Sequence, residues 1–217
     1  SGRPPATVTF SFSSTTVHSP NNAALGSVIV TSPATKSIPY DNTASDISKA
    51  YLQCSAASSY PSGVSNLQGS TTAGTTVFPT SVAGIGYRLT RAATGQHVQA
   101  YPSESYVPPT SSSATNVVPA FNWYMELIKT GPLSGNFTVP SGIIGTYNVG
   151  GQTALQIILP TPITVNSPTC SVSSGGNVSV TLSSATTTQL SAAGATAGNT
   201  NFSIAVSCDA GVTVLLR

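Results

Sequence analysis

The sequence predicts an all-β protein that begins with a β-sandwich, and three observations support this fold class. Short apolar segments alternate with Ser and Thr at period 2, which is the pattern of a strand with one buried face. These segments recur at roughly ten-residue spacing with turn residues between them, as in sandwiches and barrels. No amphipathic helical pattern of useful length occurs. A chain of 217 residues is long enough for one or two such domains.

The expected strands of the first 165 residues follow the alternating segments. They lie at 8–12, 26–31, 51–54, 76–78, 82–91, 121–129, 137–139, 155–159 and 163–165. The run FNWYMELIK at 121–129 is the most apolar, with Trp123, Met125 and Leu127 on one face. Polar stretches rich in Ser, Gly or Pro at 32–49, 55–75 and 101–119 are predicted to be surface loops.

A second domain is predicted to begin near residue 166, after a stretch punctuated by three prolines. Its apolar residues alternate again in two segments. They are Val178, Val180 and Leu182, and then Phe202, Ile204 and Val206. About 50 residues are too few for a complete sandwich domain, which needs about 100. We therefore expect residues 166–217 to be the beginning of a domain that continues beyond Arg217.

The composition excludes several classes of protein. Only 12 residues are charged (7 Lys or Arg and 5 Asp or Glu), and the net charge is +2. There is no basic patch, so nucleic acid and anionic membranes are poor candidates as partners. No run of 18 apolar residues is present, so no membrane insertion is expected. Low net charge with ample apolar content also argues against disorder.

No catalytic, metal or cofactor site is predicted. His18 and His97 are isolated in the sequence, and the cysteines do not form the C-x-x-C pairs of zinc sites. No nucleophile elbow or phosphate loop occurs. The carboxylates are scattered, and an acid–base pair such as Glu104 with Glu126 has no support from spacing. The sequence therefore predicts a protein that is not an enzyme.

Six residues in three parts of the sequence are candidates for ligand binding. Arg88 and Arg91 lie on the predicted strand 82–91, and each is either a solvated or locally paired arginine or a clamp for carboxylates and hydroxyls. Tyr147 lies in the Gly-rich stretch GTYNVGG, where a tyrosine at a loop tip is typical of binding surfaces. The other candidates lie on the proline-rich stretch 101–119, and they are Tyr101, Glu104 and Tyr106.

The second domain resembles a known family. The segments PTCSV at 168–172, NVSVTL at 177–182 and FSIAVSC at 202–208 are similar to the opening of the pilin domain of chaperone–usher fimbrial proteins. The resemblance implies a disulfide between Cys170 and Cys208, which would contribute about 4 kcal/mol in the chain-entropy model. Cys54 is then left over, either as a buried free thiol or, as we prefer, with a partner upstream of Ser1.

The first domain extends this resemblance. The segments AALGSVI at 23–29, YLQC at 51–54, VAGIGYRLTR at 82–91 and ELIKTG at 126–131 occur in the order found in two-domain tip adhesins of chaperone–usher fimbriae. The match is closest to adhesins like MrkD of type 3 fimbriae. It implies a receptor-binding adhesin domain at 1–165 and the N-terminal part of an immunoglobulin-like pilin domain at 166–217.

The resemblance also implies partners and a location. The receptor would be a host extracellular-matrix protein, such as a collagen-like protein, or a glycan. The periplasmic chaperone, the usher and the adjacent pilin would bind by strand donation, with the alternating apolar residues of 178–182 and 202–206 in the groove or core. The protein would lie at the fimbrial tip after passing through the periplasm. The alternative is a structural minor pilin or adaptor without a receptor, although 169 residues before Cys170 are many for such a subunit.

Overall fold

The computed structural model describes residues 5–36, 53–54, 58–107, 116–117, 122–173, 177–209, 212 and 214. These residues form strands and turns, without any helix. In this part of the chain there is accordingly no helix long and apolar enough to cross a membrane. The chain divides into two compact units, Ser1–Ser167 and Pro168–Arg217. The predicted boundary near residue 166 lies close to this division.

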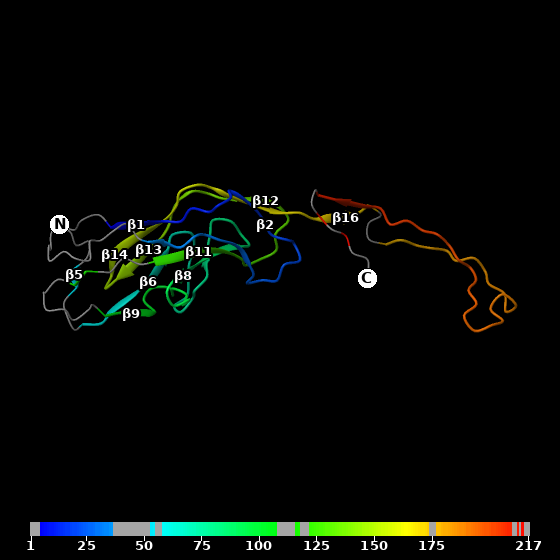
Figure 1. Cartoon of the computed structure of the whole chain (residues 1–217), viewed down its shortest axis with the longest axis horizontal. Helices are drawn as coiled ribbons and strands as arrows, with labels where there is room; N and C mark the ends of the chain where they lie inside the picture. The colour runs from blue at the N-terminus through cyan, green and yellow to red at the C-terminus, as the bar shows by residue number, and fades with distance from the viewer. Residues whose placement is uncertain are drawn as a thin grey trace. The chain divides into compact units, whose positions relative to one another are not determined.

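The first unit contains two large sheets (Figure 1). One sheet has the strand order β1-β14-β13-β6-β9. Its strands are β1 (Ala6–Thr9), β14 (Gln152–Leu159), β13 (Gly142–Val149), β6 (Tyr60–Asn66) and β9 (Glu104–Tyr106). The edge strand β1 runs parallel to β14, whereas the other neighbours are antiparallel.

The other large sheet has the strand order β3-β11-β8-β7. Its strands are β3 (Val28–Thr31), β11 (Asn122–Lys129), β8 (Ile85–Arg91) and β7 (Phe78–Pro79), and β4 (Thr35–Lys36) also pairs with β11. All of its pairs are antiparallel. Strands β8 and β11 pair along their whole common length, from Trp123 opposite Arg91 to Lys129 opposite Ile85.

The apolar core lies between these two sheets and makes the first unit a sandwich. Trp123, Met125 and Leu127 are buried, so the face predicted for the run 121–129 is confirmed. From the opposite sheet, Tyr147 meets Trp123 with ring centroids 5.3 Å apart in an edge-on arrangement. Such aromatic contacts add to the burial of apolar area. The predicted all-β fold is thus confirmed.

Smaller sheets complete the first unit. The strands β12 (Gly135–Val139), β15 (Ile163–Ser167) and β2 (Thr16–His18) form a sheet in the order β12-β15-β2, whose Val17, Ile163 and Val165 join the same core. The strands β5 (Gln53–Cys54) and β10 (Asn116–Val117) form a separate pair. The side chain of Cys54 lies outside the described residues, so the prediction for its pairing stays a prediction.

Among the strands in stretches that the sequence did not mark as strands are β2, β4 and β10, of two or three residues each, and β6, β9 and β13. Strand β6 lies inside the predicted loop 55–75, β9 lies inside the predicted loop 101–119, and β13 covers the Gly-rich stretch around Tyr147. Glycine is unfavourable in a strand unless another group approaches the backbone closely. At Gly145 a Cβ atom would lie 2.6 Å from Tyr87 Oη, so the glycine is required by the core and does not indicate a loop.

Among its described residues, the second unit has one short strand pair and one covalent cross-link. Strands β16 (Cys170–Val172) and β17 (Val206–Cys208) are antiparallel, and Cys170 and Cys208 form the predicted disulfide, which is confirmed. The strand predicted at 178–182 is absent, and the predicted strand at 202–208 is reduced to its last three residues. In the part of this unit that the structure describes, no second sheet packs against their larger apolar side chains. Val178, Leu182, Phe202, Ile204 and Val206 are 39% to 69% exposed.

Candidate functional site

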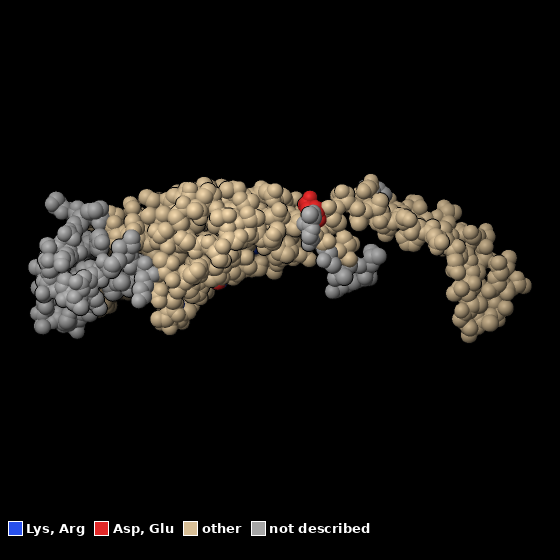
Figure 2. Space-filling view, turned by 45° about the horizontal axis from the view of Figure 1, so that its top comes forward, with Lys and Arg blue, Asp and Glu red and all other residues tan. Residues whose placement is uncertain are grey.

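Charged side chains are few on the first unit, and those that the structure describes make contacts within the chain. On the face shown in Figure 2 the described surface is almost entirely uncharged. The Nζ atom of Lys129, for example, donates to the carbonyl oxygens of Pro20 and Asn21. The other four charged side chains that the structure describes in this unit form two ion pairs. The pairs are Arg91 with Glu104 and Arg88 with Glu126.

The Glu104 cluster joins three of the predicted site residues. Glu104 begins β9, Arg91 ends β8, and Tyr147 comes from β13. Arg91 Nη2 and Tyr147 Oη donate to Glu104 Oε2 at 2.7 and 3.2 Å. Glu104 Oε1 accepts from the backbone N of Gln99 at 3.0 Å. The side chain of Glu104 is only 12% exposed, so this carboxylate holds the stretch that precedes β9 to the two sheets.

Burial and the Glu104 carboxylate set the proton affinities in this cluster. Burial acts to lower the pKa of Arg91, but the hydrogen bond and charge of Glu104 outweigh it, so that the pKa of Arg91 is raised. Burial raises the pKa of Tyr147 to about 12. At neutral pH Arg91 is therefore a cation beside the Glu104 carboxyl group, and Tyr147 is a neutral phenol.

Tyr147 does not lie at a loop tip, so that part of the prediction is wrong. Its side chain belongs to β13 and is 2% exposed, against Trp123 and Glu104. The physical reason is the pairing of β13 with both β14 and β6, which places Tyr147 in the interior of the sandwich. Tyr106 is partly buried against the core, opposite Tyr60 in the pairing of β6 with β9.

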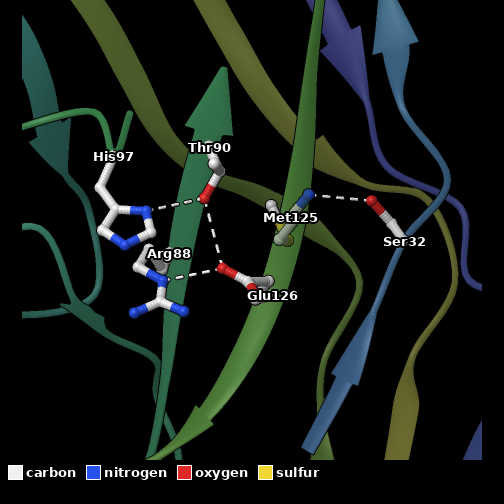
Figure 3. A network of polar contacts seen from close by, with 6 residues as sticks. All are labelled: Ser32, Arg88, Thr90, His97, Met125 and Glu126. Carbon is white, nitrogen blue, oxygen red and sulfur yellow. Dashed lines mark hydrogen bonds and ion pairs between the residues drawn. The ribbon is translucent and has the colours of Figure 1, made fainter. Parts of the chain in front are cut away.

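The Glu126 cluster lies on β8 and β11 (Figure 3). Arg88 and Glu126 are directly opposite each other in the pairing of these strands, and Arg88 Nε donates to Glu126 Oε2 at 2.8 Å. Thr90 Oγ1 donates to the same oxygen at 3.3 Å, and it lies 3.0 Å from His97 Nδ1. Arg88 is thus paired locally with Glu126, which is one of the alternatives that the sequence leaves open for it.

A polar pocket lies at the end of β6 and is called here the Tyr101 pocket. Its volume is about 520 Å³, within the range of small-molecule sites. It is lined by Val64, Ser65, Asn66, Leu67, Gly69, Ser70, Thr71 and Tyr101. Of the predicted site residues, Tyr101 alone lines it. Sequence reasoning missed the others because they lie in a stretch read only as a loop.

The described residues contain no group of three or more His, Cys, Asp or Glu side chains that could hold a metal ion. The structure brings the predicted residues into four places. Arg91, Glu104 and Tyr147 meet in the Glu104 cluster, Arg88 lies in the Glu126 cluster, Tyr101 lines the pocket, and Tyr106 lies opposite Tyr60.

Comparison with known proteins identifies related chains. A family model described as the MrkD-like receptor binding domain matches residues 14–166. A fimbria adhesin protein of Klebsiella pneumoniae is 33% identical over 138 residues, which are 64% of this chain and 41% of that protein. The matched region thus spans less than half the length of this curated relative.

Two solved structures are similar in fold. The receptor binding domain of the plasmid-born adhesin MrkD1P of Klebsiella pneumoniae has a TM-score of 0.51 and 24% identity, covering 77% of this chain and 94% of that one. The ambient temperature fimbriae adhesin AtfE of Proteus mirabilis has a TM-score of 0.42 and 13% identity, covering 76% and 98% of the two chains. The first of these likenesses supports the sandwich fold of the first unit.

Proposed function

Because this chain belongs to the family of MrkD-like receptor-binding domains, we propose that it is an adhesin that attaches a bacterial fimbria to a host or matrix receptor. The family match over residues 14–166 carries this proposal, and it agrees with the resemblance drawn from the sequence motifs. The receptor would be a collagen-like protein or a glycan. The first unit would hold the receptor, at the fimbrial tip.

Within the first unit we propose different roles for the predicted site residues. Tyr101 would contact the receptor, because it is partly exposed and lines a pocket. Arg91, Glu104 and Tyr147 would act as positioning residues, since they hold the Gln99 backbone two residues before Tyr101. Arg88 and Tyr106, which are also partly exposed, remain proposed contacts.

For the second unit we propose joining to the fibre by donor-strand complementation. Its exposed apolar side chains occur at alternate positions of 178–182 and 202–206, as expected where a strand from a partner covers one face. The periplasmic chaperone would supply that strand first, the usher would receive the complex, and the adjacent pilin would replace the chaperone. A structural minor pilin would share this unit but would have no receptor.

Binding of residues 1–217 to immobilised matrix proteins and host glycoproteins tests the adhesin proposal. We expect saturable binding to at least one of them, and competition by the same protein in solution. A chain that binds none of these surfaces, while it still forms a complex with its chaperone, would be a structural subunit. Phe202→Asp is the matched variant for the second unit, because it should abolish the chaperone complex and leave receptor binding unchanged.

A further inference from the structure

The first wall of the Tyr101 pocket is fixed by backbone hydrogen bonds. Val64 N donates to Gln99 O at 2.9 Å, and Tyr101 N donates to Val64 O at 2.9 Å. The two backbones approach so closely that a Cβ atom at Gly63 would lie 2.6 Å from Tyr101 N. The stretch that carries Tyr101 is thus held against β6, so the backbone that bears the Tyr101 ring has a defined position beside the pocket.

The opposite wall, formed by residues 67–71, is held by the side chain of Asn66 and by the backbone bond from Leu67 N to Ile144 O at 3.1 Å. Asn66 Nδ2 donates to the carbonyl oxygens of Gly69 and Pro79, each at 3.1 Å. Asn66 Oδ1 accepts from Tyr87 Oη at 2.9 Å. Both ends of this amide are therefore used inside the protein, and they tie the loop to the core of the sandwich.

The two walls are also joined to each other. Gly74 N donates to Ser103 Oγ at 2.6 Å, and Ala100 N donates to Thr75 O at 2.7 Å. A ligand that enters this pocket meets walls that are already ordered, so it does not have to compensate the conformational entropy of forming them.

The chemistry of the lining selects the class of ligand. All eight lining residues are uncharged, and the side chains of Ser70, Thr71 and Tyr101 have no hydrogen bond to another described residue. A charged ligand would lose hydration here without an opposite charge in return. A purely apolar ligand would leave the pocket's hydroxyls and peptide groups without partners. A ligand with many hydroxyls and apolar C–H surface avoids both costs.

We propose that the Tyr101 pocket binds a neutral saccharide, with one sugar face against the Tyr101 ring and its hydroxyls bonded to Ser70 and Thr71. This proposal rests on the adhesin function proposed above and narrows it to glycan receptors without acidic sugars. The pocket volume suits a small ligand, and its open side leaves room for the rest of a longer saccharide chain.

The test is binding of the full chain to immobilised oligosaccharides that share one backbone and exist in neutral, sialylated and sulfated forms. We expect the neutral forms to bind best. Tyr101→Ala should weaken that binding about tenfold or more, because aromatic residues in binding pockets carry much of the affinity. Tyr101→Phe keeps the ring and should lose much less, and Tyr124→Ala removes a tyrosine of β11 that does not line the pocket.

Each outcome decides something about this site. Unchanged affinity of Tyr101→Ala, with a native emission spectrum of Trp123, would overturn the pocket as the binding site. A preference for the sialylated or sulfated forms would overturn the neutral ligand class. If the full chain binds deglycosylated matrix protein but none of the saccharides, the saccharide inference is wrong and the adhesin function stands. Binding to neither would overturn the adhesin function as well.

Discussion

The two units of this chain contain the same alternation of apolar and polar residues, but only the first unit buries its apolar side chains. In the first unit, Leu89 and Met125 are fully buried between two sheets. In the second unit, Phe202 and Ile204 are 60% and 46% exposed. The sequence pattern is alike in both, whereas the presence of an opposing sheet differs.

This difference shows what alternation can and cannot specify. Period-2 patterning marks a segment that is able to form a strand with an apolar face. Burial of that face depends on a second layer, which the first unit supplies from its own chain. In the second unit we propose that a strand from another protein does so. The stability of the first unit should therefore depend on its own core. The stability of the second unit should depend on its disulfide and on strands from its partners.

The largest predicted effect tests whether the disulfide acts on the second unit alone. The double substitution Cys170→Ser and Cys208→Ser should make the β16–β17 pair easier to open by about 4 kcal/mol. Amide hydrogen exchange in these strands should become about a thousandfold faster, since each 1.4 kcal/mol is a factor of ten. The urea transition of the first unit, followed by fluorescence of Trp123, should not move. A shift of that transition would mean that the two units unfold together.

The second prediction compares the two apolar faces directly. Leu89→Ala should lower the free energy of unfolding of the first unit by about 3 kcal/mol, because it leaves a cavity between two sheets. Ile204→Ala removes an exposed side chain of the second unit and should cause no measurable loss in the free chain. Urea denaturation followed by circular dichroism measures both. Equal losses from the two variants would contradict the difference in burial described above.

The third prediction concerns carboxylates in the two units. Glu104→Gln leaves Arg91 without its counter-charge in a mostly buried position, so it should cost about 1–2 kcal/mol of stability. It should also accelerate hydrogen exchange at the backbone amide of Gln99, because that amide donates a hydrogen bond to Glu104. Glu126→Gln, in a similarly buried ion pair, is the control that should lower stability without that local effect. Asp209→Asn in the second unit should change neither the stability of the first unit nor hydrogen exchange at Gln99, since Asp209 is exposed.

The smallest predicted effect is a dependence on alkaline pH that belongs to the first unit. The pKa of Tyr147 is raised to about 12, whereas an unfolded tyrosine titrates near 10. Between these values the unfolded chain holds fewer protons, so the free energy of unfolding falls as pH rises, by at most about 1.4 kcal/mol per pH unit. Below pH 10 this contribution is fully present.

Tyr147→Phe should make that decline shallower by about 1 kcal/mol between pH 9 and pH 11. The measurement is urea denaturation at each pH with Trp123 fluorescence. The second unit contains no tyrosine, so amide exchange in β16 and β17 provides the internal reference. An identical slope in the variant would show that Tyr147 does not hold its proton more tightly in the folded protein.

Much of the fold could be predicted from the sequence, because β8, β11 and β14 have alternating apolar residues that face one core. Strands β6 and β13 could not be recognised in the same way. Gly63 and Gly145 occur in these strands because a neighbouring backbone or a tyrosine hydroxyl leaves no room for a side chain. In a sequence, glycines at such positions look the same as glycines in loops.

The candidate site was predicted only in part for a related reason. Arg91 is predicted as a binding residue from its charge on the strand 82–91, Glu104 from the proline-rich stretch 101–119, and Tyr147 from its Gly-rich stretch. The structure joins them to one another through contacts between strands that lie far apart in the chain. Tyr101 does line a pocket. The other wall of that pocket is the loop 67–71, and nothing in the sequence indicates that this loop lies beside Tyr101.

The scarcity of charge has a consequence for the salt concentrations at which this protein can work. Dissolved ions weaken attractions between exposed charges, and their screening length falls from about 10 Å at 0.1 M to about 3 Å at 1 M. The two ion pairs that the structure describes in the first unit are mostly buried, and the lining of the Tyr101 pocket is uncharged. Neither the stability of the sandwich nor the strength of its attachment should therefore depend much on ionic strength, from dilute media to strongly saline ones.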